Sequence, residues 1–115
     1  MKNNPLNIVS VDTATLSPPK KTSTRDVAQA KFDRLWLQNP EQFDPTRNCM
    51  EKERLQRSLA LIESQGALNG KIAVDLGSGK GDFSRLLRDK GAQVTAVDIS
   101  ANAIKAFEAA GNTEN

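Results

Sequence analysis

Histidine is absent from this chain of 115 residues, and cysteine occurs only once, as Cys49. The chain therefore offers no histidine general base, no Cys/His zinc site and no internal disulfide. Cys49 stands beside Met50 at an expected helix start, where we interpret it as a packing residue rather than a nucleophile. The sequence predicts neither a metal site nor catalysis by cysteine.

Long apolar runs are also missing, and the charge is nearly balanced. No run approaches the roughly 20 residues that span a membrane, and the N-terminus lacks the continuous apolar segment of a signal peptide. The formal net charge of +2 is too small and too evenly spread to indicate a nucleic-acid surface. We expect a cytoplasmic protein without a membrane span or a nucleic-acid partner.

The first part of the chain divides into a tail and a helical segment. Residues 1–26 are rich in Asn, Ser, Thr, Pro and Lys, and we predict a disordered tail in which "LNIVSV" is a candidate for a short extended piece. Residues 27–66 form a predicted helical segment. Its first helix ends before Pro40, and its second covers roughly residues 49–65 behind Asn48, which has the spacing of a helix cap.

Beyond this segment, strand and helix patterns alternate. The unbroken apolar run from Ile72 to Val74 is typical of a buried strand, and "AQVTAVDIS" is a second strand candidate. A helix is predicted after each strand, with Gly91 and Gly111 as the stop signals. This order predicts the α/β class, with parallel strands joined by right-handed crossovers.

The stretch "VDLGSGKGD" at residues 74–82 holds three glycines at alternate positions between the first strand and its helix. Glycines weaken regular elements, but they permit a positive φ and a close approach of the backbone to another surface. Ligands of open α/β sheets bind at the carboxyl ends of the strands. Asp98 ends the second strand, where its carboxylate is expected beside the glycine loop and can accept hydrogen bonds from a ribose diol.

Three ligand interpretations compete for this loop. A Walker loop requires G-x-x-x-x-G-K-[ST], which the sequence around Gly79 and Lys80 does not satisfy. The dinucleotide fingerprint G-x-G-x-x-G/A would place Asp82 against a pyrophosphate, which a carboxylate repels. The pattern D-x-G-x-G-x-G is matched in full from Asp75 to Gly81. A structural turn without a ligand stays open as the plain alternative.

On this pattern the chain resembles the class I S-adenosylmethionine-dependent methyltransferases, whose first motif is this loop. The resemblance covers roughly residues 68–110 and implies a Rossmann-like methyltransferase fold. It also implies that Asp75 helps to organise the methionine end of S-adenosylmethionine, that Asp98 binds the ribose hydroxyls and that Ile99 packs against adenine. The implied cofactor site consists of Asp75, Gly77, Ser78, Gly79, Gly81, Asp98 and Ile99.

The resemblance leaves the catalytic residues and the methyl acceptor unassigned. The family has a seven-stranded sheet, and we expect here only its first two core strands with their flanking helices, so that residues 67–115 form a partial cofactor-binding domain of a truncated fold. The apolar edge "KIAVDL" would then be open to association with another chain. The expected function is methyl transfer to an unidentified acceptor. The alternative is a non-catalytic module that binds the cofactor or associates with a partner.

Overall fold

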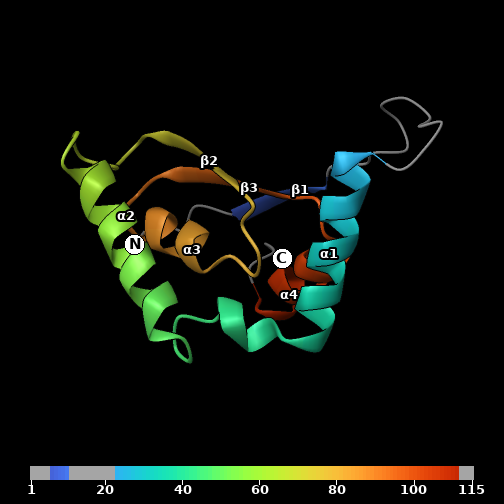
Figure 1. Cartoon of the computed structure of the whole chain (residues 1–115). Helices are drawn as coiled ribbons and strands as arrows, with labels where there is room; N and C mark the ends of the chain where they lie inside the picture. The colour runs from blue at the N-terminus through green and yellow to red at the C-terminus, as the bar shows by residue number, and fades with distance from the viewer. Residues whose placement is uncertain (1–5, 11–22, 112–115) are drawn as a thin grey trace.

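The computed structural model describes residues 6–10 and 23–111. Its elements, drawn in Figure 1, follow one another along the chain as strands, α-helices and one short 3-10 helix, η2. Their bounds are β1 Leu6–Ser10, α1 Thr24–Gln38, η2 Pro40–Phe43, α2 Cys49–Glu63, β2 Ile72–Leu76, α3 Asp82–Asp89, β3 Gln93–Asp98 and α4 Ala101–Ala109. Within this described part of the chain, no helix is long and apolar enough to cross a membrane.

The three strands form one parallel sheet in the order β1-β3-β2. The sheet confirms the predicted α/β class with parallel strands, and it contains one strand more than the two expected. The additional strand, β1, pairs with β3 so that Leu6 lies opposite Val94. β1 lies in the predicted tail and confirms the candidate extended piece "LNIVSV", so residues 6–10 are not disordered. Residues 1–5 and 11–22 lie outside the described residues.

The core lies between the sheet and helices α3 and α4. Figure 1 shows these two helices beneath the sheet, with α2 beside α3 and α1 beside α4. Alternate strand residues point into this layer because successive side chains of a strand face opposite sides. The buried cluster consists of Leu6, Leu68, Leu87, Ala92, Val94, Ala96 and Phe107.

The opposite face of the sheet is largely uncovered. On β2, the side chains of Ile72, Val74 and Leu76 are 82%, 59% and 76% exposed, and Val9 of β1 is 47% exposed. β2 also stands at one edge of the sheet among the described strands. The sequence "KIAVDL" is therefore an open apolar edge, as expected. The prediction of a buried strand from Ile72 to Val74 is wrong, because no described element covers this face, whereas parallel sheets are ordinarily covered on both faces.

The two N-terminal helices are capped by side chains. Ser23 and Asp26 form a reciprocal capping box, so α1 begins at Thr24 rather than at the predicted Val27. Asn48 accepts hydrogen bonds from the first backbone amides of α2, which confirms the predicted cap. These caps fix where the helices start and hence which of their side chains face the glycine loop.

Helix α1 is attached to the turn between β3 and α4. The amide Nε2 of Gln29 donates to the carbonyl oxygen of Ile99 at 2.9 Å. The Ser100 hydroxyl donates to Asp33 Oδ1 at 2.6 Å, and the side-chain amide of Asn102 donates to the Asp33 carbonyl at 2.8 Å. The N-terminal helix is thus held directly against the end of the strand that carries Asp98.

Candidate functional site

The glycine loop joins the carboxyl end of β2 to the start of α3. Gly77, Gly79 and Gly81 have φ values of 71°, 57° and 94°, a region that side-chain-bearing residues rarely adopt. The amides of Gly77 and Ser78 both donate to the carbonyl oxygen of Val97, at 2.7 and 3.1 Å. The loop therefore bends across the end of β3 and uses these backbone donors internally.

Two of these glycines differ in what surrounds them. A Cβ on Gly79 would lie 2.6 Å from Cζ2 of Trp36, so the indole of α1 occupies the space that a side chain would need. A Cβ on Gly77 would meet nothing within 4 Å. Glycine at position 79 thus allows the loop to pack against Trp36, whereas at position 77 only the positive φ demands it.

Asp98, at the end of β3, fixes the loop from the other side. The residue is 8% exposed. Its Oδ2 accepts a hydrogen bond from the Gly79 amide and its Oδ1 accepts one from the Ser100 amide, both at 2.9 Å. Each carboxylate oxygen can accept a second bond, so Asp98 can hold the loop and still receive ligand hydroxyls.

Two adjoining cavities open beside this loop. The first, of about 230 Å³, is lined mainly by polar and charged side chains, and we name it the polar cavity. The second, of about 430 Å³, includes Phe32, Val97, Asp98 and Ile99, and we name it the apolar cavity. Both are lined by Trp36, Phe43, Leu76, Gly77 and Gly79.

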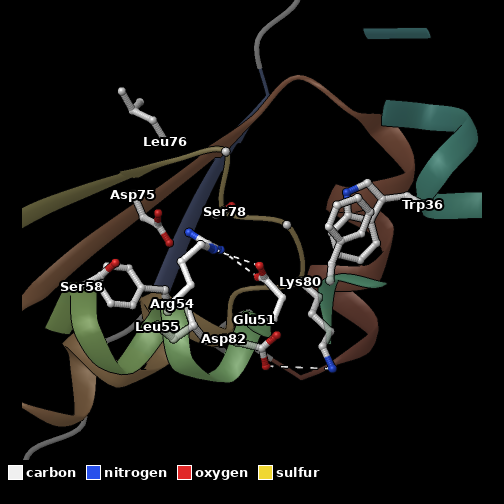
Figure 2. A pocket seen from close by; sticks show the side chains of 14 residues that line it. Trp36, Glu51, Arg54, Leu55, Ser58, Asp75, Leu76, Ser78, Lys80 and Asp82 are labelled. Atoms are coloured by element: carbon white, nitrogen blue, oxygen red, sulfur yellow. Dashed lines mark hydrogen bonds and ion pairs between the residues drawn. The ribbon is translucent and has the colours of Figure 1, made fainter. Parts of the chain in front are cut away.

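Opposite charges from two elements meet in the polar cavity, as Figure 2 shows. Arg54 of α2 donates from Nε and Nη2 to the two carboxylate oxygens of Glu51, at 2.9 and 2.7 Å. Asp75 of β2 accepts a hydrogen bond from the Ser84 hydroxyl at 2.7 Å. Burial raises the pKa of Asp75, while the bond from Ser84 and the charge of Arg54 oppose that rise.

A second charged group closes the cavity near the start of α3. Lys80 Nζ lies 3.3 Å from Asp44 Oδ2 and 3.9 Å from Asp82 Oδ1, so Lys80 is paired rather than simply solvated. Asp82 also accepts a hydrogen bond from Arg85. Burial is the main cause of the raised pKa of Asp82, and the neighbouring cations Arg85 and Lys80 oppose it.

The hydroxyl oxygen of Ser78 is buried in this site. Among the residues that the structure describes, its Oγ has no hydrogen-bond partner. Ser78 lines the polar cavity. A buried hydroxyl without a partner costs free energy and calls for an explanation such as a ligand or a water molecule.

Comparison with protein families gives one match. Residues 74–115 match the family model described as "Methyltransferase domain". This match indicates the class I S-adenosylmethionine-dependent methyltransferase family. No curated protein and no solved structure matches the chain.

The fold places six of the seven site residues predicted from the sequence on the cavity walls. Asp75 and Ser78 line the polar cavity, Asp98 and Ile99 line the apolar cavity, and Gly77 and Gly79 line both. Gly81 lines neither cavity, and instead forms the N-cap of α3. The fold thus brings these six residues together around the two cavities. Their role in cofactor binding stays a prediction.

Sequence reasoning missed the wall that the N-terminal helices supply. Phe32 and Trp36 have the i,i+4 spacing of an ordinary apolar helix face, and the charged pair of α2, Glu51 and Arg54, has the i,i+3 spacing of an ordinary solvated face. The sequence gives no local signal that these side chains meet the glycine loop. The missed wall residues are Phe32, Trp36, Phe43, Glu51, Arg54, Leu55 and Ser58.

Proposed function

We propose that this chain binds S-adenosylmethionine across the two cavities and supplies the cofactor site of a methyltransferase. The observation that carries the proposal is that an apolar cavity and a charged cavity adjoin and share the glycine loop as a wall. The cofactor has the same division, because it joins an adenosine to a charged amino acid group. A methyltransferase domain in residues 74–115 supports this choice of ligand.

The apolar cavity suits the adenosine. Asp98 lies on its wall and has acceptor capacity for the ribose hydroxyls, and Ile99 next to it offers an apolar surface for the base. Phe32, which lines the apolar cavity alone, adds an aromatic face on which a purine ring can stack. These contacts agree with the roles that the family resemblance implies for Asp98 and Ile99.

The polar cavity suits the amino acid end of the cofactor. Asp75 offers a carboxylate to an ammonium group, and Arg54 offers a guanidinium to a carboxylate. The unpartnered hydroxyl of Ser78 supplies one further donor and acceptor. A zwitterion would therefore find a partner for each of its charges.

A phosphate-bearing ligand fits this site poorly. Three carboxylates, those of Glu51, Asp75 and Asp82, line the polar cavity. The amides of Gly77, Ser78 and Gly79 donate to Val97 and Asp98, so they do not form a cradle of free donors for an anion. The donor set thus favours a ligand with a cationic group and no phosphate.

The chemistry that S-adenosylmethionine supplies when bound is a methyl group on an electrophilic sulfonium. The residues of this chain hold and orient the cofactor, because such a transfer depends chiefly on the alignment of the acceptor with the methyl group. We assign no catalytic residue and no acceptor.

The proposal is tested by titrating the ¹⁵N-labelled chain with S-adenosylmethionine and, as a control, with NAD. We expect amide shifts at residues 77–81 and 98–99 with S-adenosylmethionine alone. Asp98→Ala should weaken binding about tenfold or more, since a charge-assisted hydrogen bond contributes about 1.5–3 kcal/mol and 1.4 kcal/mol is tenfold. Unchanged amide spectra, or an equal response to NAD, would contradict the proposal.

A second candidate function is association through the uncovered sheet face. It is favoured by the exposed apolar side chains of Ile72, Val74 and Leu76 on an edge strand. Exposed apolar edges of this kind pair with other chains. Ile72 and Val74 line neither cavity, so association through these two residues is compatible with cofactor binding, whereas Leu76 lines both cavities.

A further inference from the structure

Trp36 and Phe43 form a stacked aromatic pair at the boundary of the two cavities. Their ring centroids are 4.5 Å apart, with an angle of 22° between the ring planes. Trp36 comes from α1 and Phe43 from η2, and both line the polar and the apolar cavity. Figure 2 shows Trp36 on the opposite side of the cavity from Asp75 and Arg54.

The pair is held in place by the loop that it faces. Trp36 is only 9% exposed, and its six-membered ring packs where a Cβ of Gly79 would lie. The boundary between the cavities thus has aromatic rings on one side and the backbone of Gly77 and Gly79 on the other. The charged wall residues Asp75, Arg54 and Asp98 each line one cavity and not the other.

We propose that the Trp36–Phe43 pair recognises the sulfonium charge of S-adenosylmethionine and so distinguishes the cofactor from its neutral thioether product, S-adenosylhomocysteine. This inference rests on the proposed function. If the adenosine occupies the apolar cavity and the amino acid group the polar one, the sulfonium between them lies at the boundary. An aromatic face attracts a cation there more strongly than it attracts the neutral sulfur of a thioether.

A purely steric role of the pair makes a different prediction. A wall that only stacks on adenine contacts both ligands alike, and its loss would weaken both ligands by the same factor. A wall that only packs against the methyl group would change the ratio of the two affinities by about fourfold at most. A larger change in this ratio therefore separates recognition of charge from packing.

The experiment measures the dissociation constants of both ligands by calorimetry for the wild type, Trp36→Leu, Trp36→Phe and Phe43→Leu. Phe32→Leu is the matched control, since Phe32 lines only the apolar cavity. We expect Trp36→Leu to lower the preference for S-adenosylmethionine about five- to thirty-fold, the range that a cation–π contact supplies. Trp36→Phe should retain most of the preference, and Phe32→Leu should weaken both ligands equally.

The outcomes separate this inference from the proposed function. Suppose that both Trp36→Leu and Phe43→Leu still bind S-adenosylhomocysteine with the wild-type ratio of the two dissociation constants. In that case the aromatic pair does not recognise the sulfonium charge, and the inference is wrong. If Trp36→Leu fails to fold, the ratio for Phe43→Leu decides alone. If the folded wild type binds neither ligand, the proposed function itself fails.

Discussion

Gly79→Ala should destabilise the fold much more than Gly77→Ala, although both glycines lie in the same loop. Both have a positive φ, which costs a residue with a Cβ about 1–2 kcal/mol. Only at position 79 would the new Cβ also lie 2.6 Å from the Trp36 ring. That ring is rigid and stacked on Phe43, so moving it adds about 1–3 kcal/mol of overpacking. We therefore expect losses of about 2–5 kcal/mol for Gly79→Ala and about 1–2 kcal/mol for Gly77→Ala.

The free energy of unfolding is measured by urea denaturation with far-ultraviolet circular dichroism. Trp36 is the only tryptophan of the chain and is itself displaced, so its fluorescence is a poor measure of global unfolding here. The decisive comparison is the double-mutant cycle with Trp36→Phe, whose smaller ring should relieve the clash. Gly79→Ala should cost at least about 1 kcal/mol less in that background. Equal costs for the two glycines, with no coupling to Trp36, would refute the packing argument.

Two further predictions concern charge and the uncovered face. Burial raises the pKa of Asp75, so the folded state binds its proton more tightly, and stability should fall as pH rises from the ordinary carboxyl pKa to the raised one. Asp75→Asn should make the fall in stability with rising pH less steep in a series of thermal melts. It should also weaken S-adenosylmethionine binding. A steeper fall in stability would contradict the assignment of this pH dependence to Asp75. Val74→Lys should reduce concentration-dependent self-association, measured by size exclusion with light scattering, and should change stability little because Val74 is 59% exposed. Association at the wild-type level would remove this face as the contact.

The parts of the fold that the sequence predicts well are those that local patterns encode. The glycines of the loop demand a positive φ, and Asn48 caps α2 through its own side chain. The apolar run from Ile72 predicts β2 because its β-branched residues suit a strand. Each of these signals acts between residues that are neighbours in the chain.

The parts that the sequence does not predict depend on distant partners. The sequence predicts β1 only as a candidate for a short extended piece. It does not predict that this piece pairs with β3 and buries Leu6. Arg54 has the spacing of an exposed helical ion pair, and only the packing of α2 turns it toward Asp75. Neither fact can be read from composition or periodicity, because contacts between distant segments override local propensity.

The site therefore has two halves of different origin. The family match begins at Val74 and includes the loop and Asp98, whereas the aromatic pair and the charged pair of α2 precede it in the chain. Hydrogen bonds from Gln29 to Ile99 and from Ser100 to Asp33 connect the two halves at the end of β3. Because Trp36 also packs on Gly79, the N-terminal helices position the loop as well as enclose it. Substitutions in α1 that leave the loop sequence intact should therefore alter ligand affinity through the position of the loop.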